Sequence, residues 1–146
     1  MIRLGRPEDL PAIRELVQRA YEHYIARIGR KPGPLLDDYP ALVSKKRVHV
    51  LSEDGIKGIL VLIPEDRAML LDNIAVDPDA QGRGYGRSLL EFAEQSALAA
   101  DCESIRLYTN EAMTENIALY SRIGYVETHR AQENGLRRVY MSKRLV

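Results

Sequence analysis

The chain has 146 residues, a natural size for one domain that buries roughly 70% of the surface of its unfolded form. Its 21 basic and 21 acidic residues cancel, so no overall charge draws the protein to nucleic acid or to an anionic membrane. The longest clean apolar run, residues 59–63, is far shorter than the roughly 20 residues of a membrane-spanning helix. We therefore expect a single domain over residues 1–146, with no nucleic-acid partner and no membrane partner.

The N-terminus and the cysteine content indicate a compartment. Met1 is followed at once by a charged strand start, without the basic and then apolar segment of a secretory leader. Cys102 is the only cysteine in the sequence, which excludes an internal disulfide and suits a reducing environment. The sequence predicts a cytoplasmic protein.

The first third of the chain predicts a short strand, a long helix and a loop. Apolar and polar residues alternate over residues 2–4, and Asp9 is expected to cap a helix that ends near residue 29. Three prolines and a glycine then interrupt any periodicity, so residues 29–40 are predicted to form a loop, with one helical turn over residues 38–44.

The rest of the chain predicts three neighbouring antiparallel strands, then a helix, a parallel strand, a second helix and a final hairpin. Strands are expected at residues 48–52, 56–63, 69–76, 104–109, 125–130 and 137–143, and helices at residues 84–100 and 115–122. This order predicts an α/β (α+β) fold with a mixed, mostly antiparallel sheet of six to seven strands and helices on both faces.

The most informative segment is a glycine-rich turn between the third of these strands and the following helix. Gly82, Gly84 and Gly86 alternate there, so the backbone can approach a ligand closely. The free N–H groups of the first helical turn attract an anion such as a phosphate. A P-loop is excluded because Arg87, not lysine, follows the last glycine, and Arg87 also replaces the third glycine of a dinucleotide fingerprint.

Read from Gln81, the turn is Gln-x-x-Gly-x-Gly, and Asn116, Tyr120 and Gly124 follow at intervals of four. With these motifs, from about residue 56 to the C-terminus, the chain strongly resembles the GNAT superfamily of N-acetyltransferases. The resemblance implies acetyl-CoA as cosubstrate, with its pyrophosphate on the backbone N–H groups of residues 82–87. The cofactor-binding residues that it implies are Ile74, Ala75, Val76, Gln81, Gly82, Arg83, Gly84, Tyr85, Gly86, Arg87, Ser88, Asn110, Asn116 and Tyr120.

An amine must lose a proton before it attacks a thioester. A lysine-like amine with a pKa of about 10.4 is neutral only on the order of once in 2,500 molecules at pH 7. Asp72 lies on the strand that resembles the central strand of the superfamily, where several relatives hold an acidic residue, and we predict it as the general base. The alternative is that Asp72 pairs with an arginine or is solvated; His49 and His129 are fallback bases.

Tyr120 is predicted to face the sulfur of the cofactor, as the matching tyrosine does in relatives. Proton donation from a tyrosine of pKa about 10 to a thiolate whose acid has a pKa of about 8.5 is uphill by about 2 kcal/mol. Tyr120 therefore works best by hydrogen-bonding the sulfur as charge develops and donating late. The alternative is a tyrosine that only packs against the sheet.

The acceptor side is expected on the helix and loop of the first third, because this region varies in the superfamily and overhangs the acceptor site. The candidate substrate-binding residues are Tyr21, Tyr24, Arg27, Arg30, Asp37, Asp38 and Tyr39. Core packing is the alternative for the two helical tyrosines, and helix capping for the two aspartates.

The resemblance implies direct transfer of acetyl to a primary amine of a small molecule or a protein, in a ternary complex without a covalent enzyme intermediate. A non-catalytic domain that binds or senses acyl-CoA is the main alternative, and a nicotinamide-dinucleotide binder is a third. The sequence leaves open the identity of the acceptor, the use of other acyl groups and the formation of a homodimer.

Overall fold

A computed structural model describes residues 1–29, 31–35 and 37–146 of the chain. Its strands are β1 (Ile2–Leu4), β2 (Val48–Ser52), β3 (Ile56–Glu65), β4 (Ala68–Val76), β5 (Ser104–Asn110), β6 (Val126–Glu133) and β7 (Leu136–Arg144). Its helices are α1 (Leu10–Ile28), α2 (Tyr39–Ser44), α3 (Tyr85–Ala99) and α4 (Thr114–Arg122), with short 3-10 turns at Pro7–Asp9, Gly33–Leu35 and Pro78–Ala80.

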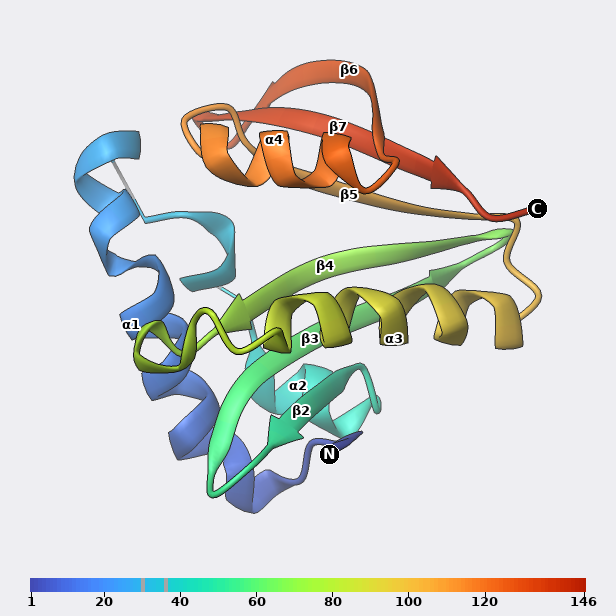
Figure 1. Ribbon diagram of the computed structural model, residues 1–146. Helices are drawn as coiled ribbons and strands as arrows, with labels where there is room; N and C mark the ends of the chain where they lie inside the picture. The colour runs from blue at the N-terminus through green and yellow to red at the C-terminus, as the bar shows by residue number, and fades with distance from the viewer. Residues whose placement is uncertain (30, 36) are drawn as a thin grey trace.

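The seven strands form one sheet in the order β1-β2-β3-β4-β5-β7-β6, and only β4 and β5 run parallel. The predicted mixed, mostly antiparallel sheet is confirmed. Helices α1 and α2 cover one face, and α3 and α4 cover the other (Figure 1). The two faces have separate hydrophobic clusters, one around Ile13, Val17 and Ile59 under α1, the other around Leu89, Leu107 and Val139 under α3 and α4.

Helix α3 packs closely on the sheet because one strand residue has no side chain. A Cβ atom added to Gly58 on β3 would lie 2.9 Å from Leu89 Cδ1 and 3.2 Å from the carbonyl oxygen of Ala75. The absence of this carbon lets the first turns of α3 settle against β3 and β4. The glycine-rich turn is thereby fixed at the end of β4.

Strands β4 and β5 separate before either of them ends. They pair only from Ala68 with Ser104 to Leu71 with Leu107, although β4 continues to Val76. Figure 1 shows the two strands diverging toward the end of the sheet where α1 passes. Between β3 and β4 the register shifts, so that Val61 lies opposite Asn73 and Leu62 opposite Leu71. Asp72 is therefore the extra residue of a β-bulge, located where the strands part.

Two local expectations are corrected. Asp9 occupies the N-cap position of α1 without a side-chain cap bond, because its carboxylate accepts hydrogen bonds from the Arg6 amide and the Arg3 guanidinium instead. Strand β3 extends through Pro64 to Glu65, beyond the end predicted at residue 63. Strand β2 pairs with β3 only as far as Val61, so the missing N–H of Pro64 leaves no β2 partner unsatisfied.

Candidate active site

The glycine turn, residues 81–87, presents a row of free backbone donors. Gly82 and Gly84 have φ values of 85° and 79°, in the left-handed region that favours glycine, and Gly84 is the N-cap of α3. Among the described residues, the first amide after the turn to find a partner is that of Ser88, which donates to the Gly84 carbonyl at 3.0 Å. The amides of residues 82–87 have no acceptor in the described part of the chain. With the positive end of the α3 dipole, they form a site for an anion.

A cleft of about 620 Å³ leads from this turn into the gap between β4 and β5, with α1 on one side and α4 on the other. On the side facing β5, none of the described strands pairs with β4 beyond Leu71. The predicted cofactor residues that line this cleft are Ile74, Ala75, Val76, Gln81, Gly82, Gly84, Tyr85, Gly86, Asn116 and Tyr120.

The other predicted cofactor residues lie outside this cleft. Arg83 is exposed, and Arg87 lines a neighbouring cavity of about 290 Å³ between α3 and α4. The Ser88 hydroxyl donates to the Gly84 carbonyl at 3.1 Å, within the helix start itself. Asn110 lies at the end of β5, where its Oδ1 accepts a hydrogen bond of 2.9 Å from the Ala112 amide.

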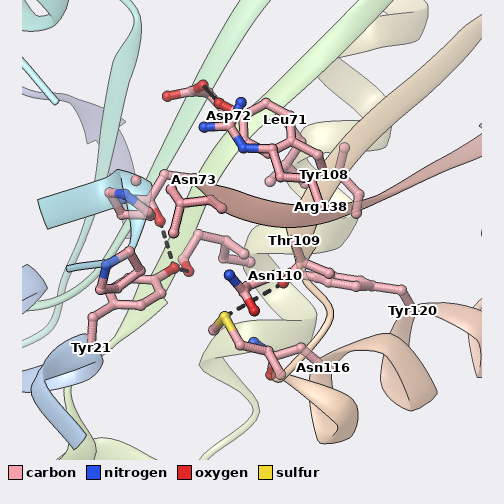
Figure 2. A pocket seen from close by; sticks show the side chains of 17 residues that line it. Tyr21, Leu71, Asp72, Asn73, Tyr108, Thr109, Asn110, Asn116, Tyr120 and Arg138 are labelled. Atoms are coloured by element: carbon pink, nitrogen blue, oxygen red, sulfur yellow. Dashed lines mark hydrogen bonds between the residues drawn. The ribbon is translucent and has the colours of Figure 1, made fainter. Parts of the chain in front are cut away.

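Beyond the cleft lies a much smaller cavity of about 50 Å³, which we call the inner chamber (Figure 2). Tyr21, Ile74, Met113, Asn116 and Tyr120 line both the cleft and the inner chamber, so the two spaces meet at these residues. A ligand that fills the cleft therefore ends where a second ligand in the inner chamber begins.

Tyr120 stands at this junction. Its side chain is 7% exposed and packs edge-on against Tyr125, with ring centroids 5.7 Å apart. Burial, with a smaller contribution from Tyr24, raises the pKa of Tyr120 to about 12. Transfer of its proton to a thiolate whose acid has a pKa of about 8.5 is then uphill by about 5 kcal/mol. This side chain is suited to donate a hydrogen bond and poorly suited to release a proton early.

Asp72 faces the inner chamber from the bulge on β4, and the Tyr108 hydroxyl donates to its Oδ1 at 3.0 Å. Asp37, from the loop before α2, faces the same carboxylate. Burial and then the charge of Asp72 raise the pKa of Asp37 to about 7, against the lowering effect of Arg138. These four residues are far apart in the sequence. Asp37 comes from a loop, and Asp72, Tyr108 and Arg138 come from the three strands β4, β5 and β7.

Two of the predicted substrate-binding residues, Tyr21 and Tyr39, form hydrogen bonds that stabilise the walls of the inner chamber. The Tyr21 hydroxyl lies 2.7 Å from Asn73 Oδ1 and 2.9 Å from the Ile74 carbonyl oxygen, both of which accept from it. The Asn73 amide in turn donates to the Tyr39 hydroxyl at 3.0 Å, and that hydroxyl donates to the Pro34 carbonyl. This buried network fastens α1 and the loop before α2 to the free side of β4.

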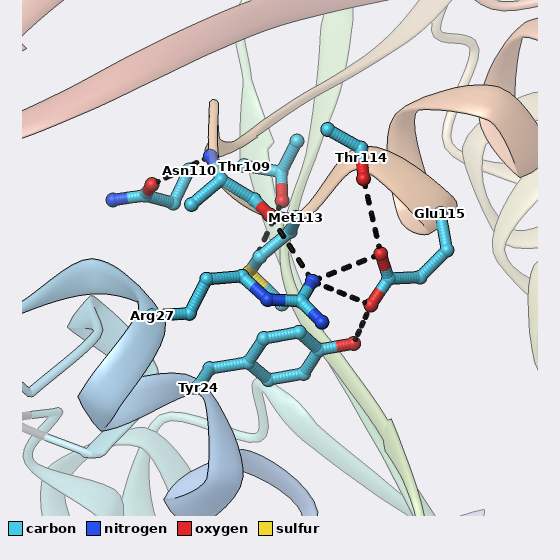
Figure 3. Close-up of polar contacts among 8 residues, drawn as sticks. Tyr24, Arg27, Thr109, Asn110, Met113, Thr114 and Glu115 are labelled. Atoms are coloured by element: carbon cyan, nitrogen blue, oxygen red, sulfur yellow. Dashed lines mark hydrogen bonds and ion pairs between the residues drawn. The ribbon is translucent and has the colours of Figure 1, made fainter.

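A second link crosses the mouth of the cleft. Tyr24 and Arg27 of α1 both reach Glu115 at the start of α4 (Figure 3): the Tyr24 hydroxyl donates at 2.8 Å, and Arg27 Nη1 lies 2.9 Å from Oε1. These bonds and the helix-start amide hold the pKa of Glu115 at about 2, with the amide as the largest cause. Arg27 therefore joins two helices and does not face the inner chamber.

The remaining candidates within the described residues are separate from these cavities. Asp38 is the N-cap of α2, where its Oδ1 accepts a hydrogen bond of 3.2 Å from the Ala41 amide, the capping role considered above. Arg30 lies outside the described residues. His49 packs edge-on against Phe92, and His129 stacks on Tyr140, so neither faces the inner chamber.

Sequence reasoning missed Asn73, Tyr108 and Arg138. Asn73 is only 3% exposed, and a buried amide in a strand is the one signal that the sequence could have offered. Tyr108 and Arg138 lie on β5 and β7, with the guanidinium carbon 4.4 Å from the centre of the tyrosine ring. Their local sequence does not identify them as site residues, because they lie together only through the order of the strands in the sheet.

Comparisons with known proteins agree with this geometry. The family model of the GNAT acetyltransferase domain matches residues 44–127. The peptidyl-lysine N-acetyltransferase YjaB of Salmonella typhimurium is 28% identical over 93 residues, which are 64% of this chain and 58% of that protein. The chain thus spans somewhat over half the length of this curated relative.

Solved structures share the whole fold. A GCN5-related N-acetyltransferase from Rhodopseudomonas palustris has a TM-score of 0.82 at 23% identity, covering 99% of this chain and 95% of that one. The protein yncA of Salmonella typhimurium, solved with acetyl-CoA, has a TM-score of 0.73 at 19% identity, covering 100% of this chain and 94% of that one.

The chain belongs to the GNAT acetyltransferase family, as the family model that matches more than half of its residues shows. The family uses acetyl-CoA. No helix in the described ranges combines the length and the apolar character needed to cross a bilayer.

Proposed function

We propose that this protein transfers the acetyl group of acetyl-CoA directly to a primary amine, with both substrates bound at once. The observation that carries the proposal is the meeting of the cleft and the inner chamber at Tyr120. The cleft begins at the row of free amides, and the inner chamber is lined by the Asp72 carboxylate. An acyl donor and an amine can therefore approach one point from opposite sides, which is the arrangement that direct transfer needs.

The cleft suits coenzyme A in shape and in chemistry. The free amides of residues 82–87 offer donors for its pyrophosphate, and the unpaired side of β4 offers backbone groups for its pantetheine arm. The Ile74 carbonyl already accepts from Tyr21, so Ala75 and Val76 are the main-chain partners that we expect to be available. Asn116 and Tyr120 bound the end of the cleft, where the thioester belongs.

In the reaction, the acceptor arrives as an ammonium ion and loses one proton to the Asp72 carboxylate, which lines the inner chamber. Its nitrogen lone pair then forms a bond to the thioester carbonyl carbon, and the carbon–sulfur bond breaks as the tetrahedral adduct collapses. The nitrogen gives up a second proton, and the departing sulfur takes one. The products are an amide, coenzyme A as a thiol, and one proton released to solvent.

Asp72 is the proton acceptor that we propose. It lies on the bulge of β4 within the inner chamber and is oriented by the Tyr108 hydroxyl. Tyr120 stabilises negative charge on the sulfur through a hydrogen bond, since its raised pKa disfavours early proton release.

The proposal is tested by thermal melting followed by a turnover assay. A ligand at 100 times its dissociation constant adds about 2.7 kcal/mol of stability, so coenzyme A should raise the melting temperature whereas NAD should not. Release of free thiol from acetyl-CoA is then measured across several amine classes. Stabilisation by coenzyme A without thiol release from any amine would favour a binding or sensing domain over an enzyme.

A further inference from the structure

The cavities of this protein form a series that continues beyond the inner chamber. An outer cavity of about 360 Å³ is lined by Lys31, Asp37 and Asn134, among others. It shares Tyr108 and Arg138 with the inner chamber, as well as Gly33 and Leu136. The route thus runs from solvent through the outer cavity and the inner chamber to Tyr120, and it is narrowest in the middle.

The size of the inner chamber limits what can pass. The inner chamber, at about 50 Å³, is far smaller than the cleft of about 620 Å³ or the outer cavity of about 360 Å³, so it is the constriction of the route. A slender chain of methylenes ending in a nitrogen is the acceptor shape that matches such a constriction. An amine on a branched carbon matches it less well, because the branch needs room beside the chain. Pro32, Pro34 and the buried ring of Tyr21 line the chamber and keep it narrow.

The charge along the route is also specific. Asp37 lines the outer cavity and Asp72 lines the inner chamber, and, after burial, the charge of Asp72 is the next largest cause that raises the pKa of Asp37. Among the described residues, the other charged or titratable groups near this pair are Tyr21 of α1, Tyr39 of α2, Tyr108 of β5, Arg138 of β7 and Lys31 of the loop.

Arg138 does not cancel the charge of the carboxyl pair. Its Nη1 lies 3.3 Å from Glu133 Oε2, and its guanidinium covers the Tyr108 ring. Lys31 is exposed to solvent, where its charge is screened. The pair between the outer cavity and the inner chamber therefore attracts a cation.

We propose that the acceptor presents its amine at the end of an unbranched methylene chain, and that Asp37, together with Asp72, binds that amine as an ammonium ion on its way to Tyr120. Asp37 is thus a specificity-determining residue of the acceptor site. A lysine side chain and a small linear diamine share this chemistry. The inference rests on the proposed acetyl transfer.

The test measures thiol release with the full chain, acetyl-CoA and three acceptors. Two are unbranched: Nα-acetyl-lysine amide, which represents a lysine side chain, and 1,5-diaminopentane. The third, alanine amide, has its amine on a branched carbon. An α-amine has a pKa near 8, so at pH 7 it is neutral far more often than a chain amine and is favoured by intrinsic reactivity. We expect kcat/KM to be at least tenfold higher for one or both unbranched acceptors.

Variants of the loop aspartate isolate its role. Asp37→Asn should raise KM for the preferred acceptor at least tenfold while the melting shift produced by coenzyme A stays the same, and Asp37→Glu should recover part of the loss. Asp66→Asn is the matched control, since it removes one carboxylate from the exposed turn after β3, away from the three cavities. Its KM should not change.

The outcomes separate the two proposals. If coenzyme A binds and alanine amide reacts as fast as the unbranched amines, or if Asp37→Asn leaves KM unchanged, the inference is wrong and acetyl transfer stands. Coenzyme A binding without reaction of either unbranched amine also contradicts the inference. If coenzyme A does not bind, the proposed transfer is wrong and the inference falls with it. The acceptor series on the wild-type chain decides the matter even if a variant does not fold.

Discussion

The Tyr108 hydroxyl on β5 donates to the Asp72 carboxylate on β4 at 3.0 Å, one residue beyond the last backbone pair of these two strands. Leu71 and Leu107 are still paired, and Asp72 and Tyr108 follow them directly. The hydrogen bond is therefore the last link across the sheet before the gap opens. It fixes the direction of the bulged carboxylate at the edge of the inner chamber.

Replacement of this tyrosine tests the link. Tyr108→Phe removes the donor and keeps the ring under Arg138, so we expect the free energy of unfolding to fall by about 1 kcal/mol. If Asp72 accepts the proton of the acceptor amine, its loss of orientation should also lower kcat, with little change in coenzyme A affinity. Urea unfolding and steady-state kinetics measure the two effects. An unchanged kcat would mean that Asp72 does not need the hydrogen bond from Tyr108 for turnover.

Two tyrosines in edge contact make a matched pair of variants. Tyr120→Phe removes the hydroxyl at the end of the cleft and should lower kcat at least tenfold, since one donor to a developing charge contributes on the order of 10²-fold or more. Coenzyme A affinity, measured by calorimetry, should stay nearly the same.

Tyr125→Phe is the control. The Tyr125 hydroxyl is buried and has no hydrogen-bond partner among the described residues, so its removal should leave kcat unchanged and raise the free energy of unfolding by about 1 kcal/mol. Equal loss of activity in the two variants would show that ring packing, and not the Tyr120 hydroxyl, matters for turnover.

The backbone conformation of the glycine turn predicts that alanine substitutions at Gly84 and Gly86 change the folding free energy differently. Gly84 has a positive φ, so Gly84→Ala should cost about 1–2 kcal/mol of folding free energy. Gly86 lies in the first turn of α3, and a Cβ there would be 3.9 Å from Val76 Cγ2, an ordinary contact. Gly86→Ala should therefore be neutral or stabilising by up to about 1 kcal/mol. Thermal melting of both variants without ligand checks the difference, and equal destabilisation would contradict it.

The carboxyl pair predicts a pH dependence of stability with a definite sign. The pKa of Asp37 rises from 3.8 to about 7 on folding, so the folded state binds its proton more tightly than the unfolded state. This contribution to stability is complete below pH 3.8 and is lost as the pH rises through about 7. The melting temperature of the wild type should thus fall more between pH 5 and pH 8 than that of Asp37→Asn. Parallel curves would show that folding does not raise the pKa of Asp37.

The parts of the site that lie close together in sequence could be predicted from it. Gln81 to Gly86 form one turn, and Asn116 and Tyr120 lie one helical turn apart, so local spacing alone places each set. The strand that feeds the turn and the helix that follows it were also predictable, because apolar periodicity determines both.

The acceptor side depends on contacts that no local pattern encodes. Asp72 reaches the inner chamber because a bulge shifts the register of β4, and a bulge has no marker in this strand. Asp37 meets it only through the path of a loop, whereas its neighbour Asp38 turns to cap α2. Tyr108 and Arg138 depend on the strand order β5-β7-β6, in which β7 comes to lie between its predecessors. These relationships follow from tertiary packing.

The most direct test of the account is a crystal structure of the protein with coenzyme A. We expect the pyrophosphate oxygens within hydrogen-bonding distance of the backbone amides of residues 82–87, and the sulfur beside the Tyr120 hydroxyl. A bound coenzyme A whose pyrophosphate lies away from these amides, or whose sulfur lies away from Tyr120, would contradict the account.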